Sequence, residues 1–200
     1  MSKTNDDEVY NNGKFRLALE YASVLHAKQI RKGAGDKGIP YLTHLLSVAA
    51  LVGEQGGGTE EVVAGLLHDA LEDHSRGGRT AQEILAMFGP QVLSFVEGCT
   101  NHFDDRAMPM HITKPLYLQH LKAQPTEVHR IALADKLHNA RTTVLNLRSE
   151  GGEVVWKRFR GGKDDTLSYY RMLGELFSEV IPGEFANEFT ACVYIMHAIG

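Results

Sequence analysis

The sequence is poor in cysteine and has no long apolar run, and each shortage excludes a class of protein. Cys99 and Cys192 match no metal-binding spacing, so we expect two reduced core thiols and no disulfide scaffold. No window approaches the roughly 18 consecutive apolar residues that a membrane helix needs. Residues 1–12 also lack the apolar segment of a secretory signal. We therefore expect a cytoplasmic protein that does not enter a membrane.

An excess of positive charge is also missing. The chain has 21 Lys and Arg residues against 25 Asp and Glu residues, which gives a formal net charge of −4. No overall positive field therefore favours nucleic acid as a partner. Any phosphate group that binds must be held by local cations or by a metal ion. The sequence leaves self-association into a homo-oligomer open.

Strand-like alternation of apolar and polar residues is absent too, as are internal repeats and low-complexity segments. With 200 residues, 43% of them hydrophobic and 23% charged, the chain is long enough to bury one sizeable core. We therefore predict an all-α fold, a compact bundle of about ten helices. Residues 1–13 are expected to form a flexible tail and residues 14–200 a single domain.

The spacing of apolar residues places the helices. Residues 14–32 form an amphipathic pattern that ends in Arg31 and Lys32, two cations that suit a helix C-terminus. A later helix is expected to start at Thr59 and to continue through residues 66–74. Polar residues interrupt the pattern at 33–38 and at 101–111, where we expect loops, the second of which could fold over a site.

Residues 66–74 are the most unusual stretch of the chain. His68 and Glu72 are four residues apart, as are Asp69 and Asp73, so each pair shares one face of a helix. Three carboxylates beside an imidazole are unfavourable unless a cation or shared protons relieve them, and a divalent metal does both. The alternative is a solvated acidic turn, although acidic groups at a helix C-terminus oppose the helix dipole by about 0.3–1 kcal/mol each.

Asp135 is a second unusual carboxylate. It lies in the sequence Ile-Ala-Leu-Ala-Asp-Lys-Leu-His-Asn-Ala-Arg at residues 131–141, where an apolar helix surrounds it. A carboxylate in that setting is poorly placed unless it points into a site. Its plainer explanation is an ion pair with Lys136 or Arg141.

Four of these residues form the strongest candidate site: His44, His68, Asp69 and Asp135. Two imidazoles and two carboxylates make a mixed nitrogen and oxygen shell, which suits Mn²⁺, Fe²⁺ or Zn²⁺ and disfavours a structural thiolate site. Taken singly, each residue has a simpler explanation, since a histidine such as His44 is often a surface residue or a hydrogen-bonded core residue.

Four segments carry a resemblance to a known family: His-Ala-Lys-Gln-Ile-Arg-Lys at 26–32, Pro-Tyr-Leu-Thr-His at 40–44, His-Asp-Ala-Leu-Glu-Asp at 68–73, and Ala-Asp-Lys-Leu-His-Asn-Ala-Arg-Thr at 134–142. Their order resembles the HD-domain metal-dependent phosphohydrolases, which implies an HD-domain bundle. Within that family the chain is similar to the guanosine tetraphosphate (ppGpp) hydrolases, namely the hydrolase domain of the Rel/Spo bifunctional enzymes and its stand-alone small relatives.

The resemblance implies a role for each of these residues. It implies one divalent metal ion, Mn²⁺ in this branch, with four ligands: His44, His68, Asp69 and Asp135. It implies that Glu72 and Asp73 orient and deprotonate the attacking water. Five further residues would bind the nucleotide: Arg31, Lys32, Asn139, Arg141 and Thr142.

The implied reaction removes the 3′-pyrophosphate from ppGpp or pppGpp and gives GDP or GTP, so the implied partner is a small-molecule nucleotide. One alternative is an HD phosphohydrolase that acts on another nucleotide, such as a nucleoside phosphate or NADPH. The other is a non-catalytic, nucleotide-binding all-α module. The clustered carboxylates argue against the second alternative, whereas nothing in the sequence separates guanine from adenine.

A basic segment at residues 156–163 matches no part of the family pattern. Its cations are Lys157, Arg158, Arg160 and Lys163. They could clamp a substrate phosphate, or they could form a solvated turn between two helices, and the sequence alone favours the turn.

Overall fold

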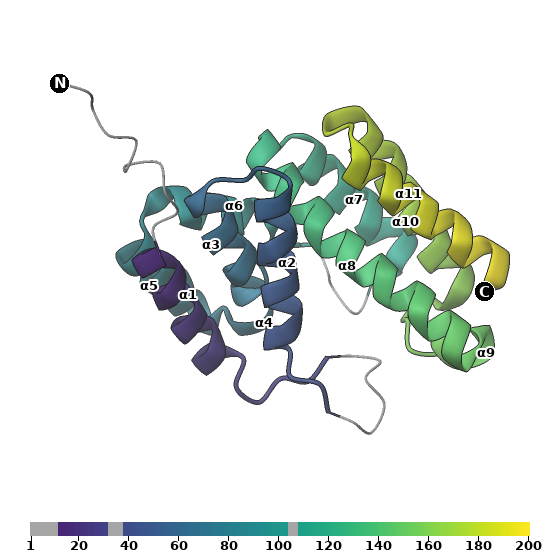
Figure 1. Cartoon of the computed structure of the whole chain (residues 1–200), viewed down its shortest axis with the longest axis horizontal. Coiled ribbons are helices and arrows are strands. Elements are labelled where there is room, and N and C mark those ends of the chain that lie inside the picture. Colours follow the sequence, from purple (N-terminus) through teal and green to yellow (C-terminus); the bar gives the residue numbers. More distant parts are fainter. Residues whose placement is uncertain (1–11, 32–37, 104–107) are drawn as a thin grey trace.

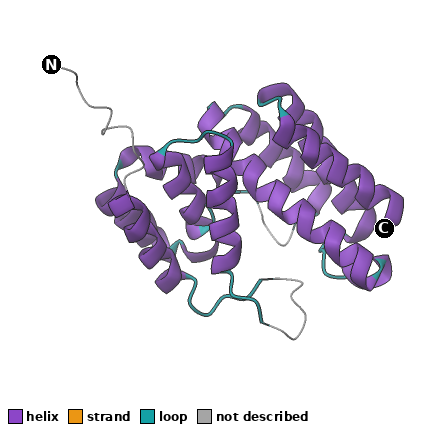
Figure 2. Cartoon of the chain, in the orientation of Figure 1, coloured by secondary structure: helices purple, strands orange, loops and turns teal. Residues whose placement is uncertain are grey.

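The computed structural model describes residues 12–31, 38–103 and 108–200. In those ranges every regular element is a helix, apart from one bridge between Ile30 and Pro40, as Figure 2 shows. The prediction of an all-α fold is therefore confirmed. None of the helices in the described ranges is apolar over a length that would cross a bilayer.

The helices follow one another as α1 (Asn12–Leu25), α2 (Leu42–Glu54), α3 (Thr59–Leu67), α4 (Ala70–His74), a 3₁₀ turn (Arg76–Gly78), α5 (Arg79–Phe88), α6 (Pro90–Cys99), α7 (Met110–Lys122), α8 (Thr126–Glu150), α9 (Gly152–Trp156), α10 (Gly162–Val180) and α11 (Glu184–Ile199). The helix α1 already includes residues 12 and 13, which we had assigned to the tail. The rest of that predicted tail lies outside the described residues.

The longest helix, α8, is the centre of the molecule. It packs against α2 on one side and against α11 on the other, and Figure 1 shows it between the N-terminal helices and the C-terminal pair α10 and α11. A helix that is covered on two sides must be apolar on both. Any charged side chain in its middle therefore needs a partner within the protein.

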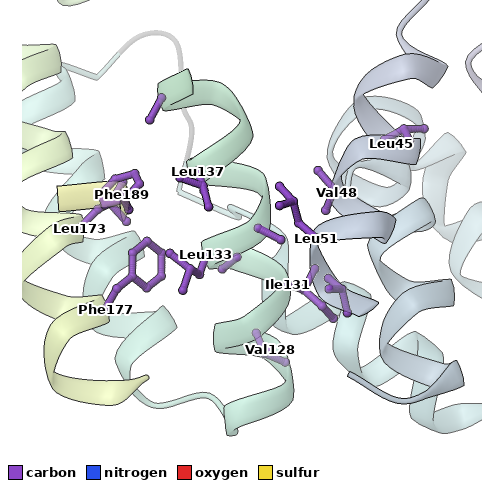
Figure 3. Close-up of a cluster of buried hydrophobic side chains, with 14 of the residues drawn as sticks. Leu45, Val48, Leu51, Val128, Ile131, Leu133, Leu137, Leu173, Phe177 and Phe189 are labelled. Carbon is purple, nitrogen blue, oxygen red and sulfur yellow. The ribbon is translucent and has the colours of Figure 1, made fainter. Parts of the chain in front are cut away.

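The side chains of α8 show how both faces are filled. Leu133 and Leu137 point toward Phe177 of α10 and Phe189 of α11, while Ile131 lies on the side of α2 (Figure 3). All five side chains are buried. Burial of each such side chain contributes about 1.5–3 kcal/mol, so α8 is held rigidly between the two halves.

The first helix ends earlier than predicted. It stops at Leu25, and residues 26–28 form a turn. The backbone then pairs with the segment before α2, since the amide of Arg31 donates to Ile39 (2.9 Å) and the amide of Tyr41 donates to Gln29 (3.0 Å). The Arg31 amide is therefore not available to continue the first helix, and the predicted helix is wrong over residues 26–31. The pairing carries Arg31 toward α8.

The predicted helix through residues 66–74 is also broken. The helix α3 ends at Leu67, and α4 starts at Ala70, so that His68 and Asp69 occupy a turn. The ring nitrogen Nδ1 of His68 donates to the carbonyl of Gly65 (2.8 Å). This local side-chain bond competes with the backbone bond that would continue the helix.

Candidate active site

Three separate helices bring a buried group of titratable side chains together. His44 lies on α2, His68 follows α3, and Asp135 lies in the middle of α8, and all three are buried. One potential ligand atom from each lies within 4.8 Å of the others. The His44 Nε2 atom is 3.2 Å from Asp135 Oδ1, and the His68 Nε2 atom is 3.8 Å from that same oxygen.

A glycine allows the two histidine-bearing elements to approach. A Cβ atom placed on Gly65 of α3 would meet the Cα atom of Ala49 on α2 at 3.3 Å. Such a contact is tighter than helices with larger residues normally allow. The close packing of α2 on α3 sets the distance between the His44 and His68 rings, whose centroids are 5.3 Å apart.

Asp69, the fourth predicted ligand, lies next to this group but is less buried. Its Oδ2 atom is 3.0 Å from Nε2 of His68 and 3.9 Å from Nε2 of His44. The hydroxyl of Tyr41 donates a short hydrogen bond to the same oxygen. Burial opposes ionisation of Asp69, but the charge of His68 outweighs it, so the pKa of Asp69 lies below its ordinary value.

The histidine side chains are oriented as metal ligands would be. Because Nδ1 of His68 donates to a carbonyl, a neutral His68 carries its lone pair on Nε2. That Nε2 atom is buried and has no hydrogen bond of good geometry within the described part of the chain, although Oδ2 of Asp69 lies 3.0 Å from it. An orphaned buried nitrogen beside two carboxylates fits a cation, and a hydrogen bond on the opposite ring nitrogen is usual for metal-bound histidine.

His44 is oriented in the same way by His138, a residue to which the sequence analysis assigned no role. Its Nδ1 atom is 2.8 Å from Nδ1 of His138. Burial and the nearby Arg31 lower the pKa of His138 to about 4, so His138 is neutral near pH 7. A neutral His138 can accept the Nδ1 proton of His44, which leaves the lone pair of His44 on the Nε2 atom that faces Asp135.

The two carboxylates create a negative potential that needs a cation. Burial by itself lowers the pKa of His68, but Asp69 and Asp135 outweigh that effect and raise the pKa to about 9. Without a metal ion, a proton on His68 would therefore balance part of the charge. Two imidazole nitrogens with two carboxylate oxygens are a donor set that divalent metals such as Mn²⁺, Fe²⁺ and Zn²⁺ accept.

Asp135 faces the cluster with one carboxylate oxygen and forms an ion pair with the other. Its Oδ2 atom forms an ion pair with Lys136 at 2.5 Å, whereas Oδ1 faces His44 and accepts a hydrogen bond from Nδ2 of Asn139 at 2.6 Å. Burial lowers the pKa of Lys136, but Asp135 outweighs this effect and raises it well above its ordinary value. The ion pair is thus part of the site rather than an alternative to it.

Glu72 lies against the cluster, and Asp73 lies one layer further out. Glu72 lines a small compartment of about 110 Å³ together with His68 and Asp69. Burial and the charge of Asp69 raise the pKa of Glu72, and its carboxylate accepts the backbone amide of Asn101 at 3.2 Å. The break precedes Asp69, so Asp69 and Asp73 remain one helical turn apart, joined by the backbone hydrogen bond from the Asp73 amide to the Asp69 carbonyl (2.9 Å).

Asp73 is held by a polar network. The side-chain amide of Gln29 donates to Oδ2 of Asp73 at 2.6 Å. The carbonyl oxygen of that amide lies 2.7 Å from Nδ1 of His26 and 3.2 Å from Nε2 of His74. Asp73 does not line the small compartment, so its carboxylate can affect the cluster only from its edge.

Three of the predicted nucleotide-binding residues meet in one place. The guanidinium of Arg31 donates to Oδ1 of Asn139 (3.0 Å) and to the hydroxyl of Thr142 (3.2 Å). These three residues line a second, larger compartment of about 860 Å³. Asn139 also connects Arg31 to Asp135. The predicted Lys32 lies outside the described residues.

Arg141 has a different position from the one we predicted. Its guanidinium forms two 2.7 Å hydrogen bonds with the carboxylate of Glu188 on α11. It lines neither the small nor the large compartment. We therefore leave Arg141 out of the nucleotide-binding set and treat it as a residue that joins α8 to α11.

Several residues of the site lie inside the quoted segments but received no role in the site. Tyr41 belongs to the segment at 40–44, and Lys136 and His138 belong to the segment at 134–142. Lys114 and Tyr169 lie far from any motif, yet with Lys136 they line both compartments. The neighbours of motif residues could have been considered from the sequence, whereas the last two depend on how α7 and α10 pack.

Comparison with known proteins gives one family match, to the HD domain, over residues 18–154. Three relatives illustrate the similarity. Two are called guanosine-3′,5′-bis(diphosphate) 3′-pyrophosphohydrolase MESH1: the Drosophila melanogaster protein is 30% identical over 68% of this chain and 73% of its own length, and the Xenopus tropicalis protein is 36% identical over 62% and 66%. A probable enzyme of the same activity from Synechocystis is 36% identical over 62% of this chain but only 16% of its own length.

Two solved structures resemble the fold. One, described as a metazoan ortholog of SpoT that hydrolyzes ppGpp, superposes with a TM-score of 0.72 at 22% identity and covers 93% of this chain and 97% of its own. At that identity the match supports the fold alone. The other, a Listeria monocytogenes EGD-e protein, superposes with a TM-score of 0.65 at 30% identity over 77% of this chain and 99% of its own.

Proposed function

The chain belongs to the HD-domain family, and we propose that it is a metal-dependent pyrophosphohydrolase that removes the 3′-pyrophosphate from ppGpp or pppGpp. The observation that carries the proposal is the buried His44, His68 and Asp135 cluster, which lies with Glu72 at a small compartment that shares lining residues with a larger cationic one. The relatives named for this activity support the choice of substrate.

The cluster would hold one divalent ion, for which we propose Mn²⁺, through His44, His68, Asp69 and Asp135. Such an ion, when bound, lowers the pKa of a coordinated water and neutralises phosphate charge. His138 and the Gly65 carbonyl keep the two imidazoles in the tautomer that leaves Nε2 free to coordinate.

The remaining residues would act on the water and on the nucleotide. Glu72, whose raised pKa makes it a stronger base than an ordinary glutamate, would accept the proton of the attacking water. Arg31, Asn139 and Thr142 would orient the nucleotide from the larger compartment. Lys136 reaches both compartments and would offset the charge of the phosphate oxygens near the bond that breaks.

A direct assay tests the proposal. Purified protein with Mn²⁺ is incubated with ppGpp, GTP, ATP and NADPH, and released pyrophosphate is measured separately from released phosphate. We expect pyrophosphate and GDP from ppGpp in one step, and no turnover by a His68→Ala variant. Phosphate release from another nucleotide, with none of the expected pyrophosphate, would contradict the substrate but leave an HD phosphohydrolase. Binding of nucleotide without any turnover would indicate the non-catalytic module.

A further inference from the structure

The two compartments of the site differ in size and share a wall. Lys114, Lys136 and Tyr169 line both of them. The compartment at the cluster measures about 110 Å³, well below the roughly 300–1,000 Å³ of a pocket that encloses a whole small-molecule ligand. The adjoining compartment measures about 860 Å³. The group that is cleaved therefore fits beside the cluster, and the rest of a nucleotide must occupy the larger space.

The larger compartment is strongly cationic although the chain as a whole is acidic. Six of its lining residues are Lys or Arg and none is Asp or Glu, while the net charge of the chain is −4. Two of the cations already have carboxylate partners, since Lys136 pairs with Asp135 and Arg158 with Glu150. For Lys157, by contrast, the described residues provide no ion-pair partner. An uncompensated cation on the wall of a ligand-sized space favours an anionic group there.

Part of the wall of the larger compartment is the turn between α9 and α10, which contains Lys157, Arg158 and Arg160. Hydrogen bonds and ring packing hold this turn in one conformation. Backbone hydrogen bonds of 3.0–3.2 Å close it, from the amides of Arg158, Phe159 and Gly162. The ring of Phe159 packs on the buried Trp156, with centroids 5.7 Å apart. Its cations are thus presented to the compartment at little cost in chain entropy.

We infer that this turn is a subsite for the polyphosphate chain on the 5′ carbon of the nucleotide, with Lys157 as a specificity-determining residue. The inference rests on the proposed function. The 3′ and 5′ substituents leave opposite ends of a ribose, so the 5′-diphosphate is directed away from the cluster when the 3′-pyrophosphate lies against it. The subsite selects nucleotides that carry phosphate on both carbons over those that carry it on one.

The chain offers a matched control for this inference. Lys163 belongs to the same basic segment and carries the same charge, but it does not line the compartment. Lys157 and Lys163 are both exposed, so neither substitution should disturb folding. The test compares Lys157→Ala and Lys157→Glu with Lys163→Ala and Lys163→Glu.

Steady-state kinetics with two substrates provide the first readout. For ppGpp we expect KM to rise about threefold in Lys157→Ala and about tenfold in Lys157→Glu, as for one partly solvated charge contact, with kcat changed by less than about twofold. For guanosine 3′-diphosphate, which has no 5′ phosphate, neither variant should change KM. The effect on ppGpp should shrink at high salt. Equal effects of the Lys157 and Lys163 variants, or equal effects on both substrates, overturn the subsite.

Binding of GDP separates this inference from the proposed function. GDP carries the 5′-diphosphate and no 3′ group, and its binding can be measured by calorimetry in metal-free buffer. Weaker binding by the Lys157 variants than by the Lys163 variants supports the subsite even if the wild-type protein cleaves no ppGpp, a result that would count against the proposed function alone. Unchanged GDP binding by the Lys157 variants, together with unchanged KM for ppGpp, refutes the subsite while leaving the hydrolase intact.

Discussion

Replacement of Glu72 by glutamine should separate chemistry from metal binding. The Glu72 carboxylate lines the small compartment with His68 and Asp69, and its nearest described hydrogen-bond donor is the backbone amide of Asn101. Glutamine has the same shape and keeps an oxygen that can accept from that amide. The substitution therefore removes the proton acceptor and little else.

The expected loss is the contribution of a positioned general base. Such a group accelerates turnover by about 10²–10⁴-fold, which corresponds to about 2.7–5.4 kcal/mol of transition-state stabilisation. We expect the Glu72→Gln variant to lose kcat in that range at saturating ppGpp, with its Mn²⁺ content by mass spectrometry and its thermal midpoint unchanged. Asp73→Asn should lose less, because Gln29 holds Asp73 outside the compartment.

The pH dependence gives a second test of the same role. A base acts only when it is deprotonated, so activity falls as the pH falls through the pKa of Glu72. Burial and Asp69 raise that pKa in the metal-free site, whereas a bound cation would lower it, so the position of the acid limb of the kcat profile measures the balance of these effects. The limb should disappear in Glu72→Gln. Loss of bound Mn²⁺ in parallel with kcat would refute this reasoning and make Glu72 a ligand, and retention of more than half the activity would exclude it as the base.

Two further substitutions test other parts of the site. Asp135→Asn leaves the ammonium of Lys136 without its partner and removes a carboxylate that faces His44, so we expect loss of Mn²⁺ binding by calorimetry. Urea unfolding in chelator should show a loss of stability near the low end of about 3–5 kcal/mol, because the Lys136 side chain retains 21% exposure. Arg141→Ala should change KM less than twofold but cost up to about 1 kcal/mol of stability at pH 7, since its pair with Glu188 is partly exposed. The hydrogen bond from Arg141 lowers the pKa of Glu188, so the pair stabilises the fold above the ordinary glutamate pKa. The difference in unfolding free energy between variant and wild type should therefore vanish as the pH falls through the lowered pKa. A tenfold rise in KM would instead show that Arg141 contacts the nucleotide.

Much of the cluster could be predicted because its residues conflict with their local surroundings. Asp135 stands in a run of apolar residues on a helix that is covered on both sides, and such a carboxylate must find buried partners. The same reasoning applies to His68 between apolar residues of α3 and α4. What the sequence could not supply was the approach of α2 to α3, which depends on the contact of Gly65 with Ala49.

The break in the helix at His68 was not predictable from apolar spacing. That spacing continues across the break, since residues on both sides of it are buried. At the break the ring of His68 donates a hydrogen bond to the carbonyl of Gly65, and apolar spacing does not encode such a local side-chain bond. The role of the basic segment was undecided for a similar reason, because only the fold, in which α9 packs against α8, shows that Lys157 lines the larger compartment.

The position of Arg141, by contrast, follows from helix geometry that the family resemblance obscured. Each residue of a helix is rotated by about 100° from the one before it. Relative to Asp135, Asn139 is therefore rotated by about 40° and Thr142 by about −20°, so these three side chains share a face. Arg141 is rotated by about −120°, toward the side of α8 that α11 covers, and there it meets Glu188. Residues that are adjacent in a sequence motif can lie on different faces of a helix. The angle around the helix axis, rather than adjacency in the motif, therefore decides which side chains can reach the nucleotide.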